Sequence, residues 1–351
     1  MLPRRLPDCR AFFFVLCFFL ETALVRDMSA AAEPGGPPEP RESMKAIRYH
    51  EFGGPEVLVY EDAPRPRPDR GEMLVRVHAA GVNPVDWKTR MGMLKGLNPN
   101  LPQVSGFDVA GVVVAVGEGV SRFKAGDAVF AYLSLKRGGG YAEYAVVRED
   151  EAALKPAKVD FVQAAAIPLA ALTAWQALYE TAGLASGQTV LIHGAAGGVG
   201  TFAVQLARAR GAKVVGTASP TNHEFLRKLG AERVIDYNTE RFEDVAHDVD
   251  VVLDTVGGDT TERSFRVVKP GGIVVSIVGD PSRFAHDSTV RTASVLVKPD
   301  AGQLARIAAL VDEGKIRPVV SLVLPLSEAR RAQEASQGGH TRGKIVLEVR
   351  K

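Results

Sequence analysis

The residues best suited to chemistry form a glycine-rich turn, VLIHGAAGGVG, over residues 190–200. An apolar strand is predicted to end there, and a helix follows at once. Gly197, Gly198 and Gly200 would let backbone amides approach a pyrophosphate, and the N-terminus of the helix would add a positive dipole end. Ala195 replaces the first glycine of the usual pattern, but the strand–turn–helix context still predicts dinucleotide binding.

The end of the next predicted strand indicates which dinucleotide binds. NAD sites usually place Asp or Glu there to bond the ribose 2′-hydroxyl. This strand ends in Thr217-Ala218-Ser219, and the first acidic residue after it is Glu224. With no carboxylate to repel a 2′-phosphate, Ser219 favours NADPH. No arginine directly follows the strand, so this preference rests on the missing acid alone.

Two different sequence patterns describe the elements that must position these residues. Up to about Ala166, short β-rich runs broken by Gly and Pro predict an antiparallel, barrel-like β domain, with strands at 73–79, 109–116, 128–132 and 141–147. From Ile167 onward, alternating strands and helices predict a doubly wound parallel sheet. We therefore expect a β domain of residues 44–166 and 299–351, a nucleotide-binding domain of residues 167–298, and an N-terminal extension of residues 1–43.

Several windows between residues 44 and 351 carry a family resemblance. They include AAGVNPVDWKTRMG, SGFDVAGVVVAVGEGVSRFKAGDAVFA, GQTVLIHGAAGGVG and HTRGKIVLEV, in that order. On these motifs the chain resembles the zinc-independent medium-chain dehydrogenases/reductases, that is, the quinone oxidoreductases related to zeta-crystallin. The resemblance implies a GroES-like β-barrel catalytic domain, a Rossmann domain that binds NADPH, an active site between the two, and a homodimer.

The same resemblance implies roles for individual residues. Asn83 and Asp86 would be catalytic, with Asn83 near the nicotinamide and Asp86 near the cleft. The cofactor-binding residues would be Asn83, Thr173, Gly197, Gly198, Val199, Ser219, Tyr237, Val278, His340 and Arg342. Structural explanations stay open for several of these, because Asn83 before a proline could start a turn and Asp86 could cap a helix.

The cysteine content bears on metal chemistry. Zinc-dependent relatives carry a Cys ligand and a Gly-His-Glu segment, whereas this chain has Phe107 at the His position and only two cysteines, Cys9 and Cys17. Because a catalytic zinc site needs about three protein ligands, we expect no metal. Hydride transfer to an acceptor that is already electrophilic then fits best, since positioning and hydrogen bonds can stabilise the resulting anion.

The resulting function hypothesis is an NADPH-dependent quinone reductase. One alternative is a reductase of 2-alkenals, enones or enoyl thioesters, in which solvent supplies the proton. Another is an NADPH-binding structural or sensor protein with little turnover. The net charge is only +2, from 43 basic and 41 acidic residues, so we expect no nucleic-acid partner.

The N-terminal extension contains a short apolar run, AFFFVLCFFL, at residues 11–20. Ten residues are too few for a membrane-spanning helix, which needs about 20, so we expect no stable membrane span. The run suits a signal peptide, but we favour the other explanation, an upstream start codon wrongly chosen. We expect a cytoplasmic protein, with export as the alternative if the run is a genuine signal.

Overall fold

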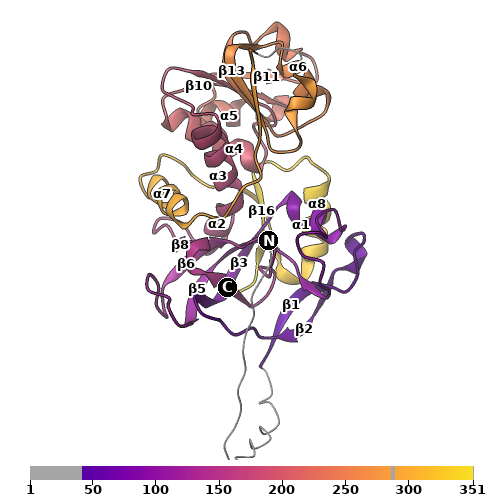
Figure 1. Cartoon of the computed structure of the whole chain (residues 1–351), viewed down its shortest axis with the longest axis vertical. Coiled ribbons are helices and arrows are strands. Elements are labelled where there is room, and N and C mark those ends of the chain that lie inside the picture. Colours follow the sequence, from indigo (N-terminus) through magenta and orange to yellow (C-terminus); the bar gives the residue numbers. More distant parts are fainter. Residues whose placement is uncertain (1–41, 286–288, 351) are drawn as a thin grey trace, which may run out of the picture. The chain divides into compact units, whose positions relative to one another are not determined.

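The computed structural model describes residues 42–285 and 289–350. The apolar run at residues 11–20 and nearly all of the predicted N-terminal extension lie outside these residues. Residues 41–351 group into one unit of the chain, and Figure 1 traces the described residues of this unit in colour. In the described ranges, no helix is long and apolar enough to cross a membrane.

A six-stranded parallel sheet carries the glycine-rich turn. Its strands are β9 (Thr189–Ile192), β10 (Lys213–Ala218), β11 (Arg233–Asp236), β12 (Val249–Asp254), β13 (Val268–Ser276) and β14 (Arg291–Ser294). They lie in the order β11-β10-β9-β12-β13-β14, with every pair parallel. Counted along the chain this order is 3-2-1-4-5-6, which is that of a Rossmann sheet, and the predicted α/β class is confirmed. Ligands of such sheets bind where the order reverses, here beside the carboxyl ends of β9 and β12.

The remaining strands form two further sheets. They are β1 (Ser43–Tyr49), β2 (Val59–Pro64), β3 (Glu72–Val82), β4 (Gln103–Val104), β5 (Asp108–Val116), β6 (Ala128–Tyr132), β7 (Tyr144–Arg148), β8 (Ala152–Leu154), β15 (Val320–Pro325) and β16 (Lys344–Glu348). The larger sheet has the order β15-β16-β3-β5-β6-β8, with β7 also paired to β3. Its pairs are antiparallel except β15–β16. A small antiparallel sheet, β2-β1-β4, completes this part of the chain.

Strand β16 joins the end of the chain to its N-terminal half. It pairs antiparallel with β3, so that Ile345 faces Val82 in the register. The residue before Ile345 in sequence, Lys344, therefore lies beside the end of β3, where Asn83 begins the next element. This pairing brings together segments about 260 residues apart.

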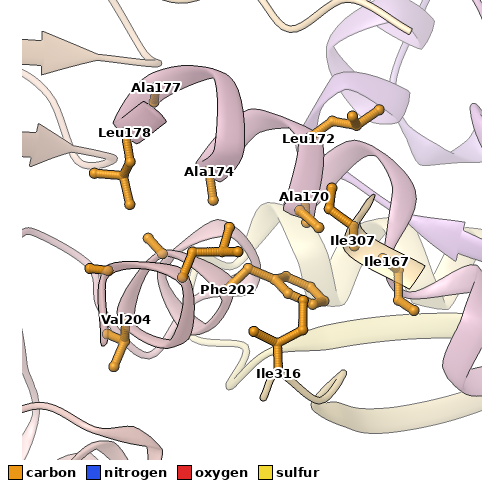
Figure 2. Close-up of a cluster of buried hydrophobic side chains, with 14 of the residues drawn as sticks. Ile167, Ala170, Leu172, Ala174, Ala177, Leu178, Phe202, Val204, Ile307 and Ile316 are labelled. Atoms are coloured by element: carbon orange, nitrogen blue, oxygen red, sulfur yellow. The ribbon is translucent and has the colours of Figure 1, made fainter. Parts of the chain in front are cut away.

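Within residues 42–285 and 289–350, eight α-helices accompany these strands. They are α1 (Pro84–Arg90), α2 (Phe161–Ala165), α3 (Pro168–Trp175), α4 (Gly198–Ala209), α5 (His223–Leu229), α6 (Asp259–Ser264), α7 (Ala301–Asp312) and α8 (Ala329–Gln337). A π-helical turn, Gln176–Thr181, continues α3. Figure 2 shows Phe202 of α4 among Ala170 and Ala174 of α3, Ile307 of α7 and Ile316, all buried. This apolar cluster fixes α4, and with it the glycine-rich turn, against its neighbours.

The structure differs from the sequence predictions in several local elements of the predicted β domain. The strand predicted at 141–147 begins only at Tyr144, because Tyr141 and Ala142 bond instead to the small sheet. The predicted β domain also contains α1, whose seven residues follow Pro84 directly. Proline suits the first position of a helix, but so short a helix carries too little apolar periodicity to be predicted.

Candidate active site

A cavity of about 1030 Å³ lies between the carboxyl ends of the parallel strands and the β3–α1 junction. Its walls include residues of both large sheets and of the segment that leads into β16. All of the predicted site residues except Asp86 line it: Asn83, Thr173, Gly197, Gly198, Val199, Ser219, Tyr237, Val278, His340 and Arg342.

The glycine-rich turn forms one wall of this cavity. Gly194 has φ +65°, the left-handed conformation that favours glycine. A Cβ on Gly200 would lie 2.3 Å from the Gly194 carbonyl oxygen, whereas one on Gly197 would lie 3.3 Å from the same oxygen. The glycine that needs the left-handed conformation is therefore Gly194, one position before Ala195. We did not predict this role for Gly194, although a glycine that soon follows an apolar strand can be recognised in the sequence.

Arg342 reaches the turn that follows β10. Its Nε donates to Asn222 Oδ1 at 2.6 Å, and a terminal nitrogen donates to the Thr221 carbonyl oxygen at 2.9 Å. The guanidinium also lies over the Phe225 ring, at 5.2 Å from its centroid. Asn222 in turn donates to Ser219 Oγ at 3.0 Å. The arginine missing from this turn in the sequence is therefore supplied by the segment before β16.

The other predicted cofactor residues differ in how far they are buried. Tyr237, directly after β11, is 56% exposed, and Val278, just after β13, is 42% exposed. Thr173 is buried, and its hydroxyl donates to the Leu169 carbonyl oxygen one helical turn earlier. His340 lines the cavity from an exposed loop.

Asn83 is buried at the junction of β3 and α1, where it is the N-cap of the helix. Its side chain does not cap the helix. Instead, Nδ2 donates to Asp108 Oδ2 at 2.8 Å, and Oδ1 accepts a hydrogen bond from Lys344 Nζ. Asn83 is thus a polar side chain on the cavity wall, fixed by two oppositely charged neighbours.

Asp86 lies behind Asn83 and not on the cavity wall. Its Oδ2 accepts hydrogen bonds from the Asn83 backbone N–H and from the Tyr141 hydroxyl, both at 2.7 Å. Its Oδ1 has no partner among the described residues. Burial raises the pKa of Asp86 to about 7, against the hydrogen bonds from Tyr141 and Asn83 that lower it. The geometry gives Asp86 a supporting contact to Asn83 and no direct contact with the cavity.

Lys344 and Asp108 belong to the site, although we did not predict them. Lys344 is 3% exposed, and its Nζ donates to the Val82 carbonyl oxygen at 2.6 Å and lies 3.8 Å from Asp108 Oδ2. Burial lowers the pKa of Lys344 and raises that of Asp108 to about 6, while their mutual attraction opposes both shifts. A charged residue inside an otherwise apolar strand, as in Gly-Lys344-Ile345-Val, is the signal that could have identified it.

His193 is a titratable residue of the same cavity whose ring is already fully bonded. Its Nδ1 lies 3.2 Å from Thr217 Oγ1, and its Nε2 lies 3.1 Å from Ser264 Oγ. Because burial lowers its pKa to about 4, His193 is a neutral hydrogen-bonding residue at neutral pH. It is therefore poorly placed to deliver a proton to a bound acceptor.

Apolar side chains line part of the same cavity. They include Val85, two residues after Asn83, together with Leu94, Leu135 and Leu296, and Lys88 is a further cationic lining residue. Among the described residues, no group of three or more His, Cys, Asp and Glu side chains is arranged to hold a metal ion. Such a cavity can hold an apolar molecule together with the polar amide of Asn83.

Comparisons with known proteins identify the two parts of the fold. Residues 69–157 match the alcohol dehydrogenase GroES-like domain, and residues 229–347 match the family described as zinc-binding dehydrogenase. The predicted GroES-like and Rossmann combination is thereby confirmed. A 2-methylene-furan-3-one reductase of Solanum lycopersicum is 37% identical over 332 residues, or 91% of this chain and 82% of that protein.

Two solved structures extend the likeness to the whole fold. The quinone oxidoreductase from Coxiella burnetii is 40% identical, with a TM-score of 0.84 over 88% of this chain and 100% of the other. The Escherichia coli quinone oxidoreductase complexed with NADPH is 31% identical, with a TM-score of 0.80 over 87% of this chain and 100% of the other.

Proposed function

The chain belongs to the quinone oxidoreductases of the medium-chain dehydrogenase/reductase family, and from this premise we propose that it is an NADPH-dependent, metal-free quinone reductase. The observation that carries the proposal is the position of Asn83. Asn83 lines the same cavity as the glycine-rich turn and as apolar side chains such as Val85. An uncharged, flat acceptor can then lie in this cavity with its carbonyl oxygen at the Asn83 amide.

The residues present fit a bound dinucleotide. Gly200 lets the start of α4 pack directly against the turn, because a Cβ there would lie 2.3 Å from the Gly194 carbonyl oxygen. The amides of Gly197, Gly198 and Val199 would hold the pyrophosphate at the N-terminus of the helix. Thr173 and Val278 would line the nicotinamide end. When bound, NADPH supplies a hydride, which the acceptor takes up with one solvent proton to complete a two-electron reduction.

The preference for NADPH over NADH rests on the turn after β10. Ser219 and Asn222 are uncharged, and Arg342 brings a guanidinium to the same turn. Tyr237 and His340 line the cavity too, as part of the proposed adenosine subsite. A guanidinium is suited to a phosphate because it carries a permanent positive charge and several donors in one plane.

Cofactor choice can be tested by placing a carboxylate in this turn. The substitution Ser219→Asp should lower the ratio of kcat/KM for NADPH to that for NADH by about tenfold or more, because the new charge repels the 2′-phosphate. Ser186→Asp, in an exposed turn before β9, is the control with the same charge change. An unchanged cofactor ratio in Ser219→Asp would reject the assignment.

The metal-free character is part of the proposal, although one matching family is described as zinc-binding. Phe107 stands where zinc-dependent relatives have a histidine ligand, and no cysteine occurs after Cys17. The donors around Asn83 are one lysine, one amide and two carboxylates. A lysine ammonium already bonded to Asn83 is not a zinc ligand. The proposal predicts full activity after dialysis against a chelator.

A second candidate is reduction of 2-alkenals, enones or enoyl thioesters. It is favoured by the named activity of the tomato relative, which is a reductase of a methylene-furanone. An enone could bind in the same cavity beside Asn83, because hydride uptake by an enone also leaves negative charge on an oxygen that an amide N–H can stabilise. A third candidate is an NADPH-binding sensor or structural protein with little turnover. It requires only the cavity residues that would bind the cofactor.

Steady-state NADPH oxidation distinguishes these candidates. We expect turnover with 9,10-phenanthrenequinone and 1,4-benzoquinone at a higher kcat/KM than with a panel of enones. The reverse order would replace the quinone proposal with the second candidate. Tight NADPH binding without oxidation by any acceptor would favour the third.

We further propose that the protein is a homodimer, on the basis of the family resemblance. Light scattering on the purified chain tests this, and we expect a mass near twice 37.5 kDa.

We also propose that the protein is located in the cytoplasm. Intact-mass measurement of the native protein tests this location, since removal of the N-terminal segment at a signal-type site would favour export.

A further inference from the structure

The amide of Asn83 is held between two buried charges of opposite sign. Lys344 Nζ donates to its Oδ1, and its Nδ2 donates to Asp108 Oδ2 at 2.8 Å. Asp108 is itself fixed, because its other oxygen accepts the Leu169 backbone N–H at 2.9 Å. Lys344 is likewise fixed by the Val82 carbonyl oxygen at 2.6 Å. Each neighbour of the amide therefore has a second anchor on a different segment of the chain.

This arrangement permits only one orientation of the amide. An ammonium group can only donate and an ionised carboxylate can only accept, so Oδ1 must face Lys344 and Nδ2 must face Asp108. The NH2 group has two N–H bonds, and Asp108 uses one of them. No described residue accepts the other. Asn83 lines the cavity, so this second N–H is the donor left for a bound molecule.

Lys344 also contacts the glycine-rich turn. Its Cδ would lie 3.1 Å from a Cβ built on Gly198, so the aliphatic part of the side chain packs against that glycine. The preceding residue, Gly343, donates its N–H to the Ala196 carbonyl oxygen at 2.8 Å. The start of β16 thus lies between the proposed pyrophosphate site and Asn83, and contacts both.

We propose that Lys344 and Asp108 are positioning residues, which fix the Asn83 amide so that its free N–H donates to the carbonyl oxygen of the acceptor. This inference rests on the proposed reductase function and adds the residues that orient its donor. An amide free to flip would present its own oxygen to the acceptor in part of the molecules, and that oxygen would repel the developing negative charge. Fixing the amide in advance avoids this loss during the reaction.

The charged groups around the Asn83 amide determine which substitutions can test its orientation. Lys344 faces Asp108 and Asp86, while the hydroxyls of Tyr132 and Tyr141 lie close to the two carboxylates. Removing the ammonium alone leaves two buried acids without their cation, which raises the pKa of Asp108 further. Removing the Asp108 charge alone leaves a buried ammonium that Asp86 still partly compensates.

The test compares Lys344→Met with Lys213→Met. Methionine keeps an apolar chain over Gly198 but removes the donor to Asn83, and Lys213 is an exposed residue at the start of β10. We expect kcat with the best quinone to fall about 10- to 100-fold in Lys344→Met, as misplacement of a catalytic group does. The dissociation constant of NADPH, from fluorescence titration, should change less than about threefold. Lys213→Met should match the wild type in both.

Two outcomes of this comparison would overturn the proposal. A kcat within twofold of wild type would show that the ammonium does not position the donor. A weakening of NADPH binding that matches the loss of kcat would assign Lys344 to the cofactor turn instead. If Lys344→Met does not fold, Asp108→Asn takes its place, because it keeps the side-chain volume while giving Asn83 an amide that can bond in either orientation.

A second readout does not depend on turnover. The side-chain amide of Asn83 can be followed by 15N NMR, with its signals assigned by their loss in Asn83→Asp. In wild type we expect sharp, strongly shifted NH2 signals that move in Lys344→Met and stay in place in Lys213→Met. Unmoved signals would overturn the inference. If wild type turns over neither quinones nor enones while the NMR signals behave as expected, the proposed function is rejected. The inference that Lys344 and Asp108 fix the Asn83 amide would then still stand.

Discussion

At the scale of single residues, two positions in the glycine-rich turn have different structural demands. Gly194 needs its left-handed conformation, and Gly200 needs its missing Cβ, because the helix starts directly over the Gly194 carbonyl. At Gly197 a Cβ would lie 3.3 Å from the Gly194 carbonyl oxygen, a tight contact but a less severe one than at Gly200. The fold therefore constrains Gly197 less strongly than Gly194 or Gly200.

The close approach at Gly200 leads to a stability and binding prediction. Gly200→Ala should lower the free energy of unfolding by about 1–3 kcal/mol, the usual cost of overpacking, and weaken NADPH binding as the turn shifts. Gly96→Ala is the matched control, since a Cβ at this exposed glycine meets nothing within 4 Å. Urea unfolding and fluorescence titration measure both effects. Equal behaviour of the two variants would mean that the turn is less rigid than described.

Asp86 predicts a pH dependence of stability. Its pKa is about 7 in the folded protein against 3.8 for the free side chain, so the folded state keeps a proton that the unfolded state has lost. Stability from this group is therefore present at low pH and falls as pH rises through that window. In Asp86→Asn the fall between pH 5 and pH 8 should be smaller by about 1–3 kcal/mol, from the linkage of pKa to stability.

Urea unfolding at the two pH values measures this difference. A part of the pH dependence should survive in Asp86→Asn, because Asp108, whose pKa is raised to about 6, contributes with the same sign. An identical decline in wild type and variant would show that the Asp86 carboxyl is ionised in the folded protein at neutral pH.

At the scale of elements, α1 and α8 are joined by a buried polar contact. Figure 1 shows the two helices near each other, and Arg90 of α1, which has no exposed surface, donates to Gln333 Oε1 of α8 at 2.9 Å. Arg90 also donates to the Gly53 carbonyl oxygen at 3.3 Å. Helix α1 begins directly after Asn83 and α8 leads into the Arg342 segment, so this contact connects two segments that line the cavity.

A double-mutant cycle tests this contact. Arg90→Met should destabilise the protein by about 1–3 kcal/mol, because it leaves Gln333 and the Gly53 carbonyl without a donor. Gln333→Met should then cost less in the Arg90→Met background than in wild type, with a coupling of about 0.5–3 kcal/mol by urea unfolding. Arg331→Met, on the exposed side of α8, should cost less than about 0.5 kcal/mol. If the losses in unfolding free energy from Arg90→Met and Gln333→Met simply add, the two helices are held together by apolar packing alone.

The elements themselves were predicted unevenly. Several strands of the parallel sheet contain apolar runs, such as Val251, Val252 and Leu253 in β12, so their type followed from sequence. Helix α1 and the helical stretch from α2 to the π-helical turn were not predicted. They are short or rich in alanine, and their conformation depends on the surfaces they cover. The domain boundaries at 166/167 and 298/299 stay predictions.

At the scale of the molecule, both large sheets contribute to one cavity, and β16 belongs to the sheet that does not carry the glycine-rich turn. A ligand in this cavity contacts both parts of the fold at once. Its binding free energy should therefore stabilise both parts together.

This shared cavity predicts a single thermal transition that moves with cofactor. At 100 times its dissociation constant, NADPH should add about 2.7 kcal/mol to the free energy of unfolding and raise Tm as one transition. NADH at the same concentration should raise Tm less. Calorimetry measures this, and two transitions of which only one moved with NADPH would show that the two sheets unfold independently.

The sequence by itself determined the fold class, the glycine-rich turn and the scarcity of thiol ligands, because each depends on neighbouring residues or on composition. It also placed Asn83 and Arg342 in the site through a resemblance. Only the tertiary structure decided what these residues contact. Lys344 bonds to Asn83 across 261 residues and Arg342 to Asn222 across 120. The first contact arises from the pairing of β16 with β3, and neither contact leaves a local pattern in the chain.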